Sequence, residues 1–585
     1  MTQAYFNHQE GNRSSVPSFK WRRKMSAIGL VLLIVGTGLL SGCTKSEDNA
    51  DPAASLKPSA ATVASAPVGT QAPSENPAPT VVPSVAETHQ QPSTAYYQIF
   101  VRSFYDSNDD GIGDLNGITE KLDYIKELGF RGIWLMPIMK SPSYHGYDVA
   151  DYESVNPDYG TVEDLARLTQ EAHKRDIKVI LDFVVNHTST EHPWFLDAAK
   201  GPSSKYRDWY IWAEDQKREP VGTSAASAGS PWHSVNGSHY LGIFWQGMPD
   251  LNLDHPDVRA ELIKSAQFWL KQGVDGFRLD AAKHVYEDFS DQKGKPEIFA
   301  KNAEWWQVFR KGLDEVNPNA YLVGEVWDSA AASGPLLNKG LNGTFNFELA
   351  SMLISSARTE SASDFAGKLE PVYTYFDKTS EGKFLDATFL TNHDQNRVMN
   401  EVAQNVDHAK MAAGLLLTLP GNPFVYYGEE IGMRGTKPDE QIREPFLWYA
   451  GGTKGKGQAA WEPLQANVNP GTGWSAEEQL TDSNSLLARY RTLLHWRKEN
   501  AALKNGGIAR YDTGAKTVAG FWRTTPEERV LVLHNLSGKP QTVTVIGTGT
   551  RTNSTSAVLL YSTSDSVKLE AGKVELPPYT TVVLQ

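Results

Sequence analysis

The segment GFRLDAAKH, residues 276–284, contains the side chains with the clearest capacity for chemistry. Its apolar residues predict a strand that carries Arg278 and Asp280 to one end, on the same face because they are two residues apart. An arginine beside a carboxylate keeps that carboxylate ionised and oriented, as a carboxylate nucleophile requires. Lys283 and His284 follow, as if placed to contact a molecule bound beside the aspartate. By itself, the same pattern also fits a salt bridge at a strand end.

The elements that would position these residues form a regular alternation of strands and helices. Apolar strands are predicted at residues 97–101, 132–136, 177–183, 274–279, 321–325, 344–347, 386–390 and 424–427, with helical patterns between them. This order predicts an α/β fold, the (β/α)8 TIM barrel, whose active site gathers at the carboxyl ends of the strands. Three more polar segments lie at or just after these strands, namely LDFVVNH (181–187), GEVWD (324–328) and FLTNHDQNR (389–397).

Other parts of the chain do not follow this alternation. The barrel is predicted to span residues 95–186 and 256–502, with an inserted domain at residues 187–255. The inserted segment follows the third strand, is rich in aromatic residues and is too long for an ordinary connection. Residues 503–585 alternate apolar and polar positions, which predicts a C-terminal antiparallel β domain with a sandwich architecture.

The four polar segments, in this order, resemble the signature regions of the α-amylase superfamily of glycoside hydrolases. The resemblance covers roughly residues 95–585, and the segments GIWLMPI (132–138) and MPDLN (248–252) match two further regions of the family. A chance match is improbable because four motifs coincide with the number and the spacing of the strands.

The resemblance implies a role for each of three carboxyl groups. Asp280 would be the nucleophile that forms a covalent glycosyl-enzyme, and Glu325 the general acid and base. Asp394 would bind sugar hydroxyls and distort the ring. Retaining enzymes of this kind place the two reacting carboxyls about 5–5.5 Å apart. We expect a raised pKa for Glu325 and a depressed pKa for Asp280, which lies beside Arg278.

The resemblance also implies which residues bind the substrate. Tyr147 would stack on the sugar that is cleaved, and the two histidines His187 and His393 would donate hydrogen bonds to the same ring. Lys283 and His284 would contact glucose on the leaving-group side. The full predicted substrate-binding set is Tyr147, Asp148, His187, Arg278, Lys283, His284, His393 and Arg443.

Asp148 and Arg443 bear on the mode of attack. In oligo-1,6-glucosidases an aspartate that matches Asp148 pairs with an arginine and closes the pocket, which gives exo attack. Arg443 resembles that partner. A simple surface ion pair is the alternative interpretation.

A possible calcium loop follows the first predicted strand. In residues 106–114, side chains with oxygen atoms recur at alternate positions, as in calcium-binding loops. The loop is not an EF-hand, because Gly117 stands where an EF-hand has its bidentate glutamate. A similar loop binds Ca2+ in several members of the family. An acidic turn capped by glycines is the alternative. The predicted ligands are Asp106, Asn108, Asp110, the carbonyl of Ile112, and Asp114. A second calcium, known in many α-amylases, would use Asn186 and the carbonyl of His284.

The amino-terminal residues have the features of a bacterial lipoprotein. Residues 1–43 combine a basic region, an apolar stretch at 27–40 and the sequence LSGC, which resembles a lipobox and contains the chain's one cysteine, Cys43. Residues 44–94 are rich in Ala, Pro and Ser, as in a disordered spacer. We therefore expect an exported lipoprotein, anchored to the outer face of the cell membrane by acyl chains such as palmitate on Cys43. A signal anchor followed by a chance cysteine is the alternative.

Composition narrows the choice of partner. The net charge of −13 argues against nucleic acid and anionic membrane surfaces, since both require basic surface. Sixteen tryptophans and twenty-three tyrosines are a weak indication of carbohydrate, because flat rings stack on sugars.

The leading hypothesis is an endo-acting hydrolase of α-1,4-glucans such as starch, glycogen and maltooligosaccharides. Asp280 is followed by Ala281, Ala282, Lys283 and His284, as in α-amylases, whereas oligo-1,6-glucosidases typically have valine after the nucleophile. An exo-acting α-glucosidase or oligo-1,6-glucosidase is the alternative enzyme. A maltodextrin-binding surface lipoprotein or an inactive scaffold is the non-enzymatic alternative. The intact carboxyl set and the barrel pattern argue against both of these.

Overall fold

The structure is a computed structural model that describes residues 94–545 and 557–585, except residues 228, 452–453 and 469–470. The predicted signal peptide, Cys43 and nearly all of the predicted spacer lie outside the described residues. Within the described part, no helix combines the length and the apolarity needed to cross a membrane.

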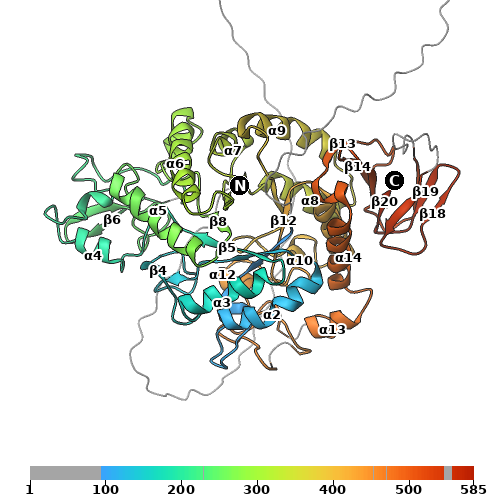
Figure 1. The fold of residues 1–585 in the computed structure, drawn as a ribbon, viewed down its shortest axis with the longest axis horizontal. Coiled ribbons are helices and arrows are strands. Elements are labelled where there is room, and N and C mark those ends of the chain that lie inside the picture. Colours follow the sequence, from blue (N-terminus) through green and yellow to red (C-terminus); the bar gives the residue numbers. More distant parts are fainter. Residues whose placement is uncertain (1–93, 228, 452–453, 469–470, 546–556) are drawn as a thin grey trace, which may run out of the picture. The chain divides into compact units, whose positions relative to one another are not determined.

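Eight parallel strands form the barrel (Figure 1). They pair in chain order, β12 returns to pair with β1, and a parallel bridge between Phe345 and Ala387 joins β10 to β11. The predicted α/β fold with a TIM barrel is therefore confirmed. The strands are β1 (Tyr96–Ile99), β2 (Gly132–Leu135), β5 (Lys178–Phe183), β8 (Gly276–Leu279), β9 (Tyr321–Gly324), β10 (Gly343–Thr344), β11 (Ala387–Phe389) and β12 (Asn422–Tyr426).

Alternate residues of the strands fill the inside of the barrel. Trp134, Ile180 and Val323 belong to one buried cluster, in which Tyr96 stacks on Phe424 with ring centroids 4.8 Å apart. Their neighbours along the strands belong to the larger core that also contains the helices. The barrel is thus a packed core, and open space for a ligand has to lie at its ends.

Helices follow most of the strands. In α2 (Leu115–Leu128) the side chain of Asp114 accepts a hydrogen bond from the N–H of Gly117, and Gly129 ends the helix in a left-handed conformation. The other helices between barrel strands are α1 (Val101–Phe104), α3 (Val162–His173), α5 (Pro256–Lys271), α6 (Pro296–Asp314), α7 (Ala330–Leu337), α8 (Phe347–Thr359), α9 (Phe365–Ser380), α10 (Val398–Glu401) and α11 (Val406–Thr418). After β12 come α12 (Asp439–Ile442), α13 (Ala476–Thr481), α14 (Leu486–Glu499) and α15 (Ala501–Asn505).

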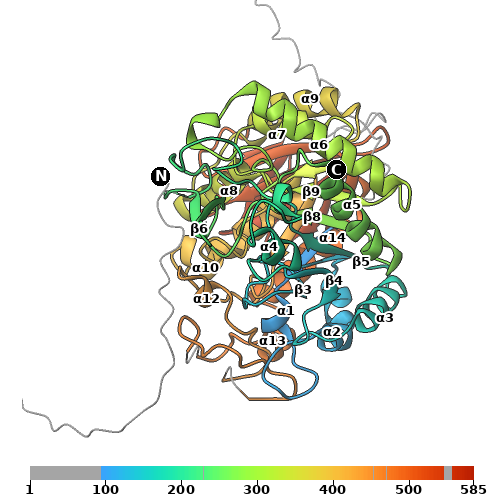
Figure 2. The ribbon, with the colours of Figure 1, turned by 90° about the vertical axis from the view of Figure 1, so that its left-hand side faces the viewer.

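The connection between β5 and α5 is the predicted insertion, which faces the viewer in Figure 2. It contains α4 (Pro193–Ala198), the short 3-10 helix η1 (Arg207–Trp209) and an antiparallel hairpin of β6 (Trp232–Val235) and β7 (Ser238–Leu241). Trp232, Leu241 and Ile243 form a small core with Phe289, which lies in the loop after β8. A second hairpin of β3 (Met139–Lys140) and β4 (Asp151–Val155) follows β2.

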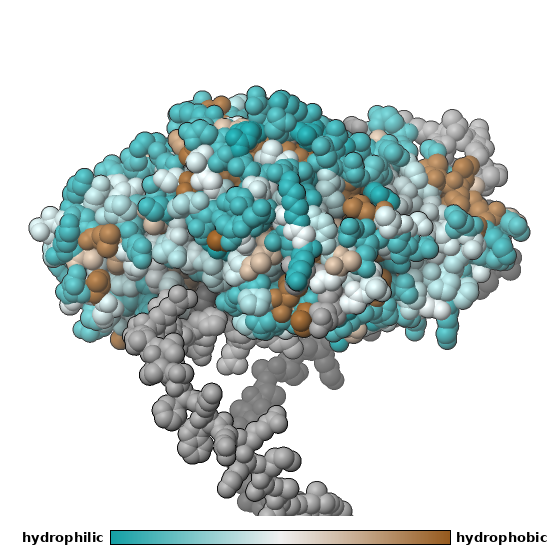
Figure 3. Space-filling model, turned by 90° about the horizontal axis from the view of Figure 1, so that it is seen from below, coloured by the Kyte–Doolittle hydropathy of each residue, from teal (hydrophilic) through white to brown (hydrophobic). Residues whose placement is uncertain are grey.

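The chain ends in antiparallel sheets, as predicted. One five-stranded and one three-stranded sheet share a buried cluster that includes Trp522, Leu533 and Val574. Their strands are β13 (Gly507–Arg510), β14 (Val518–Thr524), β15 (Arg529–Asn535), β16 (Gln541–Thr544), β17 (Leu559–Ser562), β18 (Lys568–Glu570), β19 (Lys573–Leu576) and β20 (Thr580–Leu584). The molecular face in Figure 3 is mainly hydrophilic, with apolar side chains in separate groups.

Candidate active site

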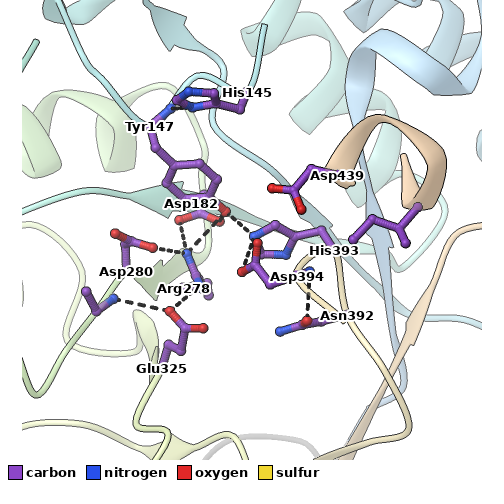
Figure 4. Close-up of polar contacts among 12 residues, drawn as sticks. His145, Tyr147, Asp182, Arg278, Asp280, Glu325, Asn392, His393, Asp394 and Asp439 are labelled. Atoms are coloured by element: carbon purple, nitrogen blue, oxygen red, sulfur yellow. Dashed lines mark hydrogen bonds and ion pairs between the residues drawn. The ribbon is translucent and has the colours of Figure 1, made fainter. Parts of the chain in front are cut away.

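One buried arginine gathers three carboxyl groups at the carboxyl ends of neighbouring strands (Figure 4). Nη1 of Arg278 lies 2.7 Å from Oδ1 of Asp182 and 2.7 Å from Oδ1 of Asp280. Its Nη2 lies 2.7 Å from Oε2 of Glu325. Asp182 is in β5, Arg278 is in β8, and Asp280 and Glu325 directly follow β8 and β9. The strand order β5–β8–β9 therefore explains why these distant segments meet.

The pairing register fixes this arrangement. Asp182 lies opposite Arg278 in the β5–β8 ladder, and Leu279 lies opposite Gly324 in the β8–β9 ladder. The close approach of β8 and β9 requires glycine at Gly276, where a Cβ atom would lie 2.0 Å from the carbonyl oxygen of Tyr321. A slip of one residue would turn Arg278 to the other face of the sheet.

Burial is the largest influence on the pKa values of these three carboxyls, and it raises each of them. It raises the pKa of Glu325 to about 7, as predicted, and the charge of Asp280 adds to the effect, whereas Arg278 opposes it. Burial also raises the pKa of Asp182 to about 7. The predicted depression at Asp280 is wrong, because burial raises its pKa and Arg278 offsets that only in part. A single guanidinium cannot balance three buried carboxylates, so the cluster retains a proton near neutral pH.

Asp394 belongs to a second polar cluster beside the first. Its Oδ1 lies 2.9 Å from Nη2 of Arg443, and its Oδ2 lies 3.0 Å from Nε2 of His393. The hydroxyl of Tyr147 lies 2.6 Å from the same His393 nitrogen and donates to Asp182 at 3.0 Å, so it links the two clusters. The rings of Tyr147 and His393 are stacked with centroids 5.6 Å apart.

In this second cluster the pKa of the carboxyl group is shifted down, whereas in the first cluster the pKa values are shifted up. Burial alone would raise the pKa of Asp394, but the contacts with His393 and Arg443 outweigh it and hold the pKa well below its usual range. Burial lowers the pKa of His393 to about 4, so its imidazole is neutral near pH 7. The Gln98 amide nitrogen lies 2.8 Å from Nδ1 of His393, which assigns the remaining proton to Nε2. Asp394 is thus an ionised carboxylate that contacts the charged Arg443 and the neutral ring of His393.

The predicted pairing of Asp148 with Arg443 is wrong. The carboxylate of Asp148 accepts hydrogen bonds from the hydroxyls of Ser141 and Ser143. Arg443 instead pairs with Asp394 and, at 3.1 Å, with Asp439. A surface ion pair is excluded as well, because Asp148 and Arg443 are both buried, at 3% exposure each.

His187 lies where the insertion joins the barrel. A backbone bridge pairs it with Asp250, and its side chain is buried with Nε2 lacking a hydrogen-bond partner among the described residues. The neighbouring Asn186 donates from Nδ2 to Oδ1 of Asp250 at 3.1 Å. Burial lowers the pKa of His187 to about 3, so the ring is neutral near pH 7 and its Nε2 is open to a hydrogen bond with a ligand.

Lys283 and His284 line the loop after β8. Nζ of Lys283 lies 2.9 Å from Oδ2 of Asp328 and 3.3 Å from Oε1 of Glu287. Nδ1 of His284 lies 3.2 Å from the carbonyl oxygen of Glu287. Burial lowers the pKa of His284 to about 3, so Lys283 supplies the positive charge here.

Several residues of the site were not predicted from the sequence. Asp182 stands near the carboxyl end of an apolar strand, and an ionisable residue inside a buried strand was a usable signal. Gln98 in β1 carries the same kind of signal. No sequence signal pointed to Asp328 or Glu287, because their contacts with Lys283 depend on the paths of loops.

The segment predicted to bind calcium folds into a tight turn whose carboxylates accept backbone hydrogen bonds. Asp106 accepts hydrogen bonds from the N–H groups of Asn108, Asp109 and Gly111, and Asp110 accepts one from Ile112. Asp114 accepts from the N–H groups of Ser107 and Gly117. In the described residues, no three Asp, Glu, His or Cys side chains are grouped as metal ligands. Carboxylate and carbonyl oxygens are the ligands that Ca2+ prefers, so the residues fit the ion. Both calcium sites remain predictions.

Comparisons with known proteins agree with this fold and site. Residues 98–506 match the model of the α-amylase catalytic domain, and residues 518–583 match that of the α-amylase SusG C-terminal domain. Alpha-amylase 3 of Dictyoglomus thermophilum is 41% identical over 84% of this chain and 92% of that protein. An oligo-1,6-glucosidase of Parageobacillus thermoglucosidasius is 33% identical over 76% and 90%. The crystal structure of an α-amylase from H. orenii has a TM-score of 0.76 at 45% identity, over 84% of this chain and 99% of that one.

The barrel, its buried carboxyl cluster and these matches define a glycoside hydrolase of the amylase type. The chain belongs to the α-amylase family.

The pKa of Glu325 predicts how activity depends on pH. Glu325 holds its proton up to about pH 7, so a step that consumes this proton slows at higher pH. We expect kcat/KM on maltooligosaccharides to fall about tenfold per pH unit above this value. On α-maltotriosyl fluoride, whose fluoride leaves without protonation, the alkaline limb of kcat/KM should be absent or much shallower. A limb equally steep on the fluoride and on maltooligosaccharides would assign the titration to another group.

Proposed function

We propose that the protein hydrolyses α-1,4-glucosidic bonds in starch, glycogen and maltooligosaccharides with retention of configuration. The observation that carries the proposal is the contact of one buried guanidinium with both Asp280 and Glu325. This shared contact places both carboxyls in one small volume, and one of them retains a proton near neutral pH, which supports a double displacement.

The reaction then proceeds in two steps. A carboxylate oxygen of Asp280 attacks the anomeric carbon while Glu325 gives its proton to the glycosidic oxygen, and the leaving sugar departs with a free hydroxyl. Forming the ester removes the charge of Asp280, which had raised the pKa of Glu325. Glu325 therefore becomes a better proton donor for departure and then a carboxylate base. It takes a proton from water, the hydroxyl oxygen attacks the anomeric carbon, and the bond to Asp280 breaks.

The residues around the two clusters have the chemistry to hold the sugar. Asp394 is an ionised acceptor for sugar hydroxyls, and Nε2 of His187 is a buried polar atom without a partner among the described residues. His393 and Tyr147 are placed beside Asp394. A buried polar atom without a partner costs free energy until a ligand satisfies it, which favours sugar binding at this position.

Endo attack is the preferred mode. The Lys283–His284 pair resembles α-amylases, and the pair of Asp148 with Arg443 that would have favoured exo attack is not formed. Attack by an exo-acting α-glucosidase or oligo-1,6-glucosidase is the second candidate, because relatives named oligo-1,6-glucosidase are about one third identical to this chain. The buried carboxyl cluster gives the non-enzymatic alternatives, a maltodextrin-binding lipoprotein or an inactive scaffold, no support.

We further propose that the protein acts outside the cell as a lipoprotein. The support is the sequence ending at Cys43, and residues 44–94 would hold the enzyme away from the lipid. A long polymeric substrate, which cannot enter a cell, is consistent with that position.

Replacing the proposed nucleophile tests the mechanism. Asp280→Asn keeps the size of the side chain and removes the attacking charge, so we expect kcat to fall at least about ten-thousandfold. Binding of maltooligosaccharide, measured by calorimetry, should remain, and the melting temperature should stay close to that of the unmodified protein. An Asp280→Asn enzyme with a substantial part of its activity would refute covalent catalysis by this residue.

The product profile tests the mode of attack. Endo attack on starch should release mixed maltooligosaccharides and lower the viscosity early, before much reducing sugar appears. Chromatography of the products over time measures this directly. Glucose as the first and only product, or efficient cleavage of isomaltose, would favour the second candidate.

We also propose that Ca2+ binds the loop of Asp106, Asn108, Asp110, Ile112 and Asp114, with Asn186 and the carbonyl of His284 as a second possible site. Ca2+ would neutralise carboxylates packed at the start of α2, so chelation should lower the melting temperature by several degrees. Readdition of Ca2+ should restore it, and Asp110→Ala should remove most of the effect. A melting temperature insensitive to chelation in the unmodified protein would remove the calcium proposal.

A further inference from the structure

Gln98 is a buried amide that contacts the second polar cluster from inside the barrel. It lies in β1 at 1% exposure, on the same face of the strand as Tyr96, which belongs to the cluster inside the barrel. Its side-chain nitrogen lies 2.8 Å from Nδ1 of His393, which follows β11. An uncharged amide buried at this depth has to form hydrogen bonds, and His393 is a partner that belongs to the candidate active site.

The other ring nitrogen of His393 has two neighbours. Nε2 lies 3.0 Å from Oδ2 of Asp394 and 2.6 Å from the hydroxyl oxygen of Tyr147 (Figure 4). Asp394 is ionised and can only accept, so Nε2 must carry a proton. The ring is neutral near pH 7, so it has no second proton and Nδ1 is bare. A bare Nδ1 requires a donor, and the amide N–H of Gln98 is in contact with it.

The proton on Nε2 also fixes the direction of the next hydrogen bonds. Because Nε2 donates, the hydroxyl oxygen of Tyr147 accepts from it, and the hydroxyl hydrogen is directed to Asp182 at 3.0 Å. Arg278 donates to the same hydroxyl oxygen at 3.4 Å. In the opposite tautomer Tyr147 would donate to Nε2, so Asp182 would lose a donor and Asp394 would face a lone pair.

The surroundings of the imidazole do not offer Nδ1 a charge. Asp394 and Tyr147 face Nε2, and the side chain of Arg443 donates to the backbone carbonyl of His393 at 3.0 Å. The charges of Arg443 and Arg278 act on the ring from a distance and disfavour a second proton on it. A glutamine amide satisfies Nδ1 and adds no charge, whereas a carboxylate at this position would accept a proton from Nδ1.

We propose that Gln98 is a positioning residue for the hydrolysis of α-glucans. Its amide holds His393 in the tautomer that carries the proton on Nε2, so that Asp394 has a donor. It thereby also sets the direction of the hydrogen bonds that run through Tyr147 to Asp182. The inference rests on the proposed function, and Gln98 acts through His393 rather than on the sugar itself.

Nitrogen NMR of histidine-labelled protein measures the tautomer. The chain has 14 histidines, and the signals of His393 are those that vanish in His393→Gln. In the unmodified protein we expect a bare Nδ1 and a protonated Nε2. Burial lowers the pKa of this ring to about 4, so its signals should not change over roughly pH 6–8. A proton on Nδ1 would overturn the proposal.

Two substitutions test the role of the amide in activity. Gln98→Met keeps the length of the side chain and removes the N–H, so kcat/KM on maltohexaose should fall about tenfold, the loss of one buried hydrogen bond. Gln98→Glu can donate while its carboxyl is protonated but only accept once ionised, so its activity should fall over roughly pH 5–8. This profile is measured on α-maltotriosyl fluoride, on which the unmodified enzyme should lack a steep alkaline limb.

Gln479 provides a matched control. It is a glutamine of α13 at 4% exposure, and its amide donates to the carbonyl of Ile431 at 2.8 Å. Gln479→Met should leave the His393 signals unchanged and kcat/KM close to that of the unmodified protein.

The possible failures can be distinguished. A fully active Gln98→Met enzyme would overturn the role of the amide, as would a Gln98→Glu profile on the fluoride equal to that of the unmodified enzyme. If Gln98→Met folds poorly, the Gln98→Glu profile and the nitrogen spectrum of the unmodified protein still decide. An unmodified enzyme inactive on both substrates would instead refute the proposed function, and the nitrogen spectrum would still test the tautomer.

Discussion

The buried guanidinium of Arg278 is the constraint on which the site depends. It is the group that allows three carboxyls to lie together inside the protein, and removing it would leave their charge uncompensated at a cost of about 3–5 kcal/mol. Its position in turn requires the register of β5, β8 and β9 and a glycine where β8 approaches β9. The barrel and the chemistry are therefore coupled through one side chain.

A second arginine, Arg443, gives another part of the site a different electrostatic environment. Around Arg278 negative groups are in excess, so a proton is retained and Glu325 can act as an acid near neutral pH. Beside His393 and Arg443, the favourable contacts of Asp394 outweigh its burial, and this carboxylate stays ionised. The hydroxyl of Tyr147 connects the two parts by contacting both Asp182 and His393. One small volume can thus hold a proton donor and, beside it, a permanent anion that can accept hydrogen bonds from sugar hydroxyls.

The sequence was most informative where local patterns decide the structure. The strands were short apolar runs bounded by turns, and the motifs stood directly at their ends, so the residue pattern alone was enough to bring Arg278, Asp280 and Glu325 to one rim. Pairings made by loops could not be predicted. Asp148 is capped by Ser141 and Ser143 because of the path of one turn. The raised pKa of Asp280 was missed because burial is a property of the whole fold.

The barrel closes through a weak seam. β10 has two residues, pairs with β9 at two positions and reaches β11 through one bridge, whereas β8 pairs with β5 and β9 at four positions each. Local opening costs least where backbone hydrogen bonds are fewest. This seam runs between the strand that carries Glu325 and the strand that leads to Asp394. On heating, a small separation here would pull the acid from the sugar-binding anion while most helices remain folded, so inactivation would precede melting.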